Sequence, residues 1–183
     1  LRGCEVVLNL ATAVRRPGQP ADWSRNDRVR REGTRALLQA AHDVSQAWAG
    51  TAAARPLRIV QQSIAMLQAG PPERLADESE PVHGPGVLAS AVDMEAFVRA
   101  SALPWVLLRD GLFYGPGTGF GSETNRLARA GVLRLPGDGS HFVSLVRPED
   151  MAAAVVRATE ADLQAETIAV VDDEPVRWRD LLA

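Results

Sequence analysis

Few side chains in this sequence have the chemistry for catalysis. The chain contains three histidines (His42, His83 and His141), one cysteine (Cys4) and one tyrosine (Tyr114), and all 20 of its basic residues are arginine. The absence of lysine excludes a phosphate-binding P-loop, Schiff-base chemistry and any proton transfer that needs a Lys–Tyr couple. A single cysteine excludes an internal disulfide and a cysteine-rich zinc site, and we expect a reducing, cytoplasmic compartment.

Other familiar constellations are missing or weak. The acidic runs at 77–80 and 172–174 fall in predicted turns, which favours solvated carboxylates, so no metal site is predicted. No Gly-x-Ser-x-Gly elbow is found, which argues against a serine hydrolase. The glycines of 115–121 alternate and do not match the G-x-G-x-x-G spacing. We therefore expect a loop at 115–121, built on the conformational freedom of glycine, and no phosphate-binding turn.

Composition narrows the class of partner. The 183 residues carry a net charge of −3 and no cluster of basic residues, which argues against nucleic-acid binding. The longest apolar runs are about half the length of a membrane span, so no transmembrane helix is predicted. Neither nucleic acid nor a membrane is therefore expected as a partner.

Apolar runs alternate with helical patterns along the chain. This alternation predicts an α/β fold, a Rossmann-like doubly wound parallel sheet that binds ligands at the carboxyl ends of its strands. A long segment without periodicity, 69–86, is predicted to be a loop that is either functional or disordered. The predicted strands are Glu5–Leu10, Leu57–Gln62, Trp105–Leu108, Phe142–Val146 and Ile168–Val171, and the predicted helices are Asp27–Val44, Val87–Ser101, Ser122–Ala130 with Ser122 as its cap, and Glu149–Ala158.

An ordered series of segments resembles the extended short-chain dehydrogenases/reductases, in their NAD-dependent epimerase/dehydratase branch. Each segment is weak alone, but together they keep the family's order over nearly the whole chain. The segments are Val7–Ala11 for "V-x-H-L-A", Gly33–Ala41 for "G-T-x-x-L-L-x-A-A", Arg58–Ser63 for the strand before the catalytic Ser, Asp77–Pro81 for "D-E-x-x-P", Leu107–Arg109 with Tyr114–Gly117 for "I-L-R … Y-G-P-G", and Leu145–Ala152 for "F-V-H-V-D-D-V-A".

The resemblance implies a fold, a cofactor and a set of site residues. Residues 1–183 would be a partial NAD(P)-binding domain that lacks the first βα units, with 115–150 contributing to the substrate side. NAD or NADP would be the cofactor, although the glycine-rich phosphate loop is not in this chain. Ser63 would be catalytic and would hydrogen-bond a substrate oxygen; the alternative is a strand-end Ser bonded to its own backbone. The cofactor-binding residues would be Leu10, Ala11, Thr12, Ser63 and Gly111, the last in an Asp110–Gly111 turn that lines the cofactor.

The sequence departs from the family where acid–base chemistry is expected. Placing Glu95 on the family's Glu puts the catalytic Tyr slot at Val87 and the Lys slot at Ala91, and neither side chain titrates. His83 or His141 could replace the missing group. An Arg that pairs with the phosphate of nucleotide sugars is also replaced, by Val143, although Arg134 or Arg147 could reach the same place.

These departures leave three functions open. The first is an atypical NAD(P)-dependent oxidoreductase or epimerase-like enzyme that acts on a small carbonyl or hydroxyl substrate without the Tyr/Lys pair. The second is a non-catalytic dinucleotide-binding sensor or scaffold, and the third is an inactive truncated product. A homodimer is also possible, paired through Arg31–Val44 and Leu88–Ser101.

Overall fold

Four parallel strands form the main sheet of the computed structural model, which describes residues 1, 3–13, 22–50, 57–68, 74–134 and 137–181. They lie in the order β1–β2–β3–β7, and each neighbouring pair is parallel. The predicted α/β class and parallel sheet are therefore confirmed. The strands are β1 (Val6–Asn9), β2 (Arg58–Ile64), β3 (Trp105–Asp110) and β7 (Glu166–Val170).

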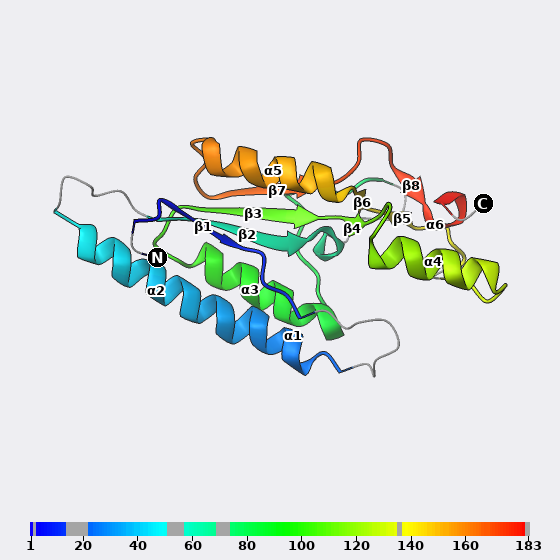
Figure 1. Ribbon diagram of the computed structural model, residues 1–183, viewed down its shortest axis with the longest axis horizontal. Coiled ribbons are helices and arrows are strands. Elements are labelled where there is room, and N and C mark those ends of the chain that lie inside the picture. Colours follow the sequence, from blue (N-terminus) through cyan, green and yellow to red (C-terminus); the bar gives the residue numbers. More distant parts are fainter. Residues whose placement is uncertain (2, 14–21, 51–56, 69–73, 135–136, 182–183) are drawn as a thin grey trace.

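Helices cover both faces of this sheet. Figure 1 shows α2 (Thr34–Trp48) and α3 (Ala89–Arg99) on one face and α5 (Pro148–Glu160) on the other. Successive residues of a strand point to opposite faces, so each buried strand supplies both layers. On β2, Ile59 packs toward α2 and α3, and Val60 packs toward α5.

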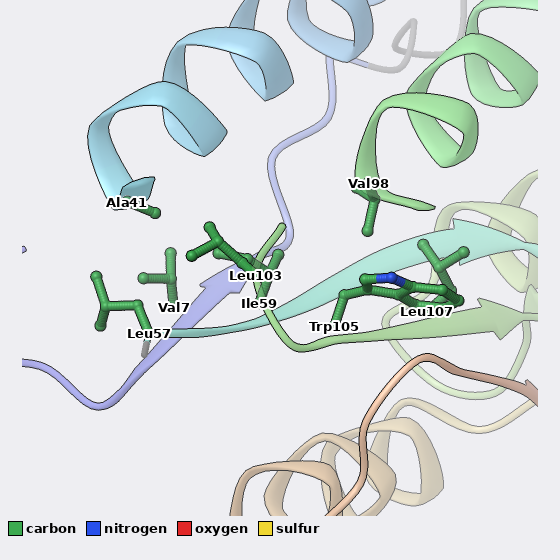
Figure 2. Packing of buried hydrophobic residues seen from close by; sticks show 8 residues of the cluster. All are labelled: Val7, Ala41, Leu57, Ile59, Val98, Leu103, Trp105 and Leu107. Atoms are coloured by element: carbon green, nitrogen blue, oxygen red, sulfur yellow. The ribbon is translucent and has the colours of Figure 1, made fainter. Parts of the chain in front are cut away.

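The core between the sheet and the α2–α3 layer is aliphatic apart from one indole ring (Figure 2). Burial of such side chains stabilises the fold by roughly 1.5–3 kcal/mol each, which explains why the strand sequences are almost continuously apolar. The members of the cluster are Val7, Ala41, Leu57, Ile59, Val98, Leu103, Trp105 and Leu107.

One long helical stretch leads into this layer. It begins with α1 (Ser24–Arg28), continues through a π-helical segment, η1 (Val29–Gly33), and runs on as α2. The apolar spacing predicts Asp27–Val44, and the observed stretch is longer at both ends. The π-helical segment breaks the regular hydrogen-bond pattern of the helix, and such breaks are frequent at functional sites.

Small elements gather beyond the carboxyl ends of the strands (Figure 1). The prediction of a single strand over 142–146 is wrong, because its two halves pair with different segments. The first half is antiparallel to β8 (Val176–Arg177), and the second half is parallel to β4 (Leu112–Phe113). Ser144 lies between the halves, and its carbonyl accepts the backbone N–H of Leu112. The elements are β4 (Leu112–Phe113), α4 (Gly119–Arg129), β5 (Phe142–Val143), β6 (Leu145–Val146), β8 (Val176–Arg177) and α6 (Trp178–Leu181).

The predicted cap of α4 is also wrong. Thr118, not Ser122, is the N-cap: its backbone is extended and its hydroxyl accepts the N–H of Gly121 at 3.2 Å. The glycine-dense segment is therefore only partly a loop. Gly115 and Gly117 have positive φ and turn the chain, whereas Gly119 and Gly121 lie in the first turn of the helix.

The described part of the predicted loop 69–86 is held against the sheet; residues 69–73 lie outside the described residues. Gln68 and Val82 form an antiparallel bridge, and the carboxylate of Glu78 accepts the backbone N–H of Ala169 at 2.8 Å. Short 3-10 turns flank this loop at η2 (Ala65–Leu67) and η3 (Gly86–Leu88). Among the described helices, none is long and apolar enough to cross a membrane.

Candidate functional site

The carboxyl end of β1 leaves a short segment open to solvent. Leu10, Ala11 and Thr12, which the resemblance assigns to the cofactor, are all exposed. Two asparagines hold this segment in place: Asn9 accepts the N–H of Ala11 at 3.3 Å, and Asn26 accepts the hydroxyl of Thr12 at 3.0 Å. The segment is thus both ordered and accessible, as a ligand-binding segment needs to be.

Ser63 lies one residue before the end of β2, at the same edge of the sheet. It is 2% exposed, and its hydroxyl donates to the Glu95 carboxylate on α3 at 2.6 Å. This is neither of the two arrangements that the sequence suggested, a substrate contact or a bond to its own backbone. Its catalytic role stays a prediction, while its contact with Glu95 is structural.

Glu95 also binds the Arg109 guanidinium from β3. The two make a two-pronged ion pair, with Nε to Oε1 at 3.0 Å and Nη2 to Oε2 at 2.8 Å. Burial opposes the charge on Glu95 and is the largest single influence on its pKa. The hydrogen bonds from Arg109 and Ser63, together with the charges of Arg109 and Arg99, outweigh burial and lower the pKa of Glu95. The trio therefore remains a charged, buried link between α3 and the two central strands.

The positions that match the family's Tyr and Lys hold aliphatic side chains in different settings. Val87 lies in η3 and is 46% exposed, whereas Ala91 lies in α3 and is fully buried. Neither side chain can exchange a proton.

The resemblance placed Asp110 with Gly111 in a turn beside the cofactor, and the structure places its carboxylate at the end of β3. Asp110 is 5% exposed, and Gln62 donates to its Oδ2 at 2.8 Å. Burial is the main cause that raises the pKa of Asp110 to about 6, against the opposing bond from Gln62 and the charge of Arg30. The burial of this carboxylate was not predicted from the sequence.

Gly111 has a clear structural role beside its predicted cofactor contact. A Cβ at this position would lie 2.7 Å from the backbone carbon of Leu145 and 2.9 Å from its oxygen. The close approach brings β4 beside β6, so the glycine is explained by packing; contact with a cofactor stays a prediction.

A cavity of about 290 Å³ opens next to this edge of the sheet. Ala65 and Gln68 line it from the end of β2, and Val143 lies on its wall within 115–150, the range predicted to form the substrate side. Its lining includes three acidic residues, Asp172, Asp173 and Glu174, and one arginine, Arg74.

Only some of the titratable residues that the sequence suggested line this cavity. His141 lines it, but His83 and the two alternative arginines, Arg134 and Arg147, are exposed and are not part of its lining. Tyr114 hydrogen-bonds Asp172 on the wall, and this bond is the main cause that raises the pKa of Tyr114. Within the described ranges no group of three metal-ligating side chains forms a candidate metal site.

Known proteins are similar to this chain in sequence and in fold. No protein-family model matches the sequence. The 3-diazoavenalumate denitrifying reductase of a Streptomyces species is 35% identical over 184 residues, which cover 93% of this chain and 56% of that protein.

Solved structures share the architecture at lower identity. The UDP-glucose 4-epimerase of Thermus thermophilus, solved with NAD, superposes with a TM-score of 0.74 at 21% identity, and the match covers 98% of this chain and 60% of the epimerase. Human epimerase family protein SDR39U1 (isoform 2), solved with NADPH, has a TM-score of 0.75 at 20% identity, with 97% and 60% covered. The chain has the fold of the extended short-chain dehydrogenases/reductases. The short-chain dehydrogenase/reductase fold predicted from the sequence motifs is therefore confirmed. The chain spans just over half the length of these similar proteins.

Proposed function

We propose that this chain forms part of an NAD(P)H-dependent reductase that delivers hydride to a small electrophilic substrate. The observation that carries the proposal is the match to a reductase at 35% identity over 93% of the chain. The structural relatives that were solved with NAD or NADPH support the choice of cofactor. The non-catalytic sensor or scaffold remains the alternative, favoured by the aliphatic residues at Val87 and Ala91.

The described residues fit a dinucleotide in part. Leu10, Ala11 and Thr12 offer an exposed, ordered backbone at the carboxyl end of β1, and one carboxylate oxygen of Asp110 is buried without a partner. A buried polar atom without a protein partner calls for an explanation such as bound water, an ion or a ligand. No G-x-G-x-x-G turn is present in this chain, so none of its residues is assigned to the pyrophosphate. The chemistry that a reduced nicotinamide supplies at such a site is a hydride.

The substrate class that we favour is a diazo compound, because the similar reductase carries that substrate in its name. Its reduction takes up one hydride and one proton and releases N₂. The acidic wall of the cavity, from Asp172 to Glu174, suits the positive charge that protonation of a diazo group creates. A small carbonyl substrate is the second candidate and needs the same hydride and proton.

The test is a turnover assay on the intact protein. NADH and NADPH binding is followed by cofactor fluorescence, and oxidation at 340 nm is followed with an aromatic diazo compound, a diazo ketone and a panel of aldehydes and ketones. We expect oxidation with the diazo compounds and matching release of N₂. Cofactor binding without turnover on any substrate would favour the sensor, and absence of binding would refute the proposal.

Ser63→Ala separates two roles of that serine in the same assay. If Ser63 contacts the substrate, the variant loses turnover while its melting temperature falls only slightly. Ser63→Thr keeps the hydroxyl and is the matched control. A homodimer through α2 and α3 is proposed as well, and sedimentation velocity of the intact protein tests it.

A further inference from the structure

The cavity beside the sheet is built from segments that are fixed to one another. The Glu78 carboxylate accepts the backbone N–H of Ala169 at 2.8 Å, and the carbonyl of Leu145 accepts the N–H of Asp172 at 2.8 Å. The cavity, of about 290 Å³, is therefore preformed, and its volume is near the lower end of the range for small-molecule sites. Its lining comes from the turn after β2, the loop segment 74–76, the segment 141–145, β7 and the segment 171–175.

The charged groups of the lining do not balance. Residues 172–174 contribute three carboxylates, and Arg74 contributes one guanidinium. This guanidinium forms an ion pair with Glu80, which is not a lining residue, so the charge of Arg74 is already offset. Even a charged imidazole at His141 would offset one of the three carboxylates and no more. The cavity therefore carries net negative charge, and a concave surface focuses such a field.

Much of the remaining lining is apolar and uncovered. Leu75 is 54% exposed and Val171 is 37% exposed, although both are large aliphatic residues that line the cavity. Phe142 and Val143 are half-buried in the same lining. Apolar side chains that line a cavity are the usual contacts of the apolar body of a ligand. The Arg177 guanidinium already lies over the Phe142 ring, 4.1 Å from its centroid, so the carboxylates are the better partners for a ligand's positive charge.

We propose that this cavity binds a small organic cation, with its charged group against the carboxylates of 172–174 and its apolar body against Leu75 and Val171. The inference deepens the proposed reductase function, because it names the charge class of the substrate, and its assignment of the cavity to the substrate rests on that function. A protonated diazo compound belongs to this class. Anionic compounds of the same size are disfavoured by the same carboxylates.

The test compares three fragments that share one ring and differ in charge. Near neutral pH benzylamine is a cation, benzyl alcohol is neutral and phenylacetate is an anion. Each is titrated into the intact protein, and its Kd is measured from the shifts of assigned backbone amide resonances. We expect benzylamine to shift the amides of 172–174 and Leu75 and to bind at least about threefold more tightly than benzyl alcohol. Equal affinity for benzylamine and phenylacetate would overturn the proposal.

A double variant tests the role of the carboxylates. Asp173→Asn with Glu174→Gln changes two exposed side chains of the lining, so the fold should be retained, and the melting temperature checks this. We expect the affinity for benzylamine to fall about 3- to 30-fold, because two exposed charge pairs are lost, and the affinity for benzyl alcohol to stay the same. The matched control, Glu160→Gln with Asp162→Asn, removes two exposed carboxylates outside the lining and should leave both affinities unchanged. If both double variants bind benzylamine like the wild type, the carboxylates of the cavity do not select the ligand and the proposal fails.

Leu75→Ser tests the apolar contact separately. It should weaken benzylamine and benzyl alcohol alike, because both fragments place the same ring against that side chain. Unchanged affinity for both fragments would show that the ring does not lie there.

The turnover assay separates this proposal from the reductase function. We expect benzylamine to compete with the diazo substrate, raising its KM without changing kcat. If the diazo compound is reduced and benzylamine leaves KM unchanged, the reductase function stands and the cavity is not its substrate site. If neither cofactor binds but benzylamine still binds as expected, the reductase function fails and the cavity stands as a site for organic cations.

Discussion

Replacing Asp110 with asparagine should change how stability depends on pH. Relative to the wild type, the variant should be more stable at neutral pH than it is in acid. An ordinary aspartate titrates near 3.8, whereas the pKa of Asp110 is raised to about 6 because burial disfavours its charge. The folded state therefore binds this proton more tightly than the unfolded state does. Its contribution to stability is fully present below pH 3.8 and is lost as the pH rises through 6.

The size of the effect follows from the two pKa values. Each pH unit between them is worth about 1.4 kcal/mol, so ionisation of Asp110 costs the fold about 3 kcal/mol by pH 7. Asp110→Asn removes that loss. The difference in unfolding free energy between the variant and the wild type should thus increase by about 3 kcal/mol from about pH 3.5 to about pH 7.

Urea unfolding at half-unit pH intervals, followed by circular dichroism, measures this difference. Asp162→Asn, which removes the carboxyl of an exposed aspartate, is the control for the loss of a surface carboxyl. Parallel pH profiles for Asp110→Asn and wild type would refute the reasoning, because they would mean that Asp110 titrates alike in the folded and unfolded chain.

Three further substitutions test other contacts, each by thermal or urea unfolding. Glu95→Ala leaves a buried guanidinium without its carboxylate and should cost about 3–5 kcal/mol. Gly111→Ala brings a Cβ to 2.7 Å from backbone and should cost at least about 1–3 kcal/mol, whereas Gly33→Ala, with open space at a helical backbone, should stabilise by about 0.5–1 kcal/mol. Thr118→Ala should cost about 1 kcal/mol and Ser122→Ala less, and the reverse order would restore Ser122 as the cap.

The main sheet could be predicted from sequence because its signal is strong and local. Strands such as Trp105–Asp110 are buried on both faces, so most of their residues are apolar, and the helices between them keep a regular apolar spacing. The segments beyond the strand ends gave weaker signals. Residues 142–146 read as a single strand, and nothing local shows that its halves pair with β8 and β4.

The place of Ser63 in the fold could be predicted from the sequence, but its contacts could not. Ser63 does lie at the carboxyl end of β2, but its bond to Glu95 depends on a helix 32 residues further along the chain. Asp110 was expected only as part of a turn beside the cofactor, because burial, which gives the carboxyl its unusual pKa, is a property of the folded chain. The contact of Arg30 with Ser90 likewise involves the π-helical segment, which apolar periodicity does not reveal.

Glu78 has a consequence for how the protein resists self-association. Its carboxylate occupies the amide of Ala169 on the outermost strand, β7, where an unprotected row of backbone groups would invite a strand from another molecule. The segment that follows β2 thereby covers a backbone amide at this edge of the sheet. Any rearrangement that draws this loop away would bare that margin, so loop motion and the tendency to form intermolecular β-structure are linked through a single side chain.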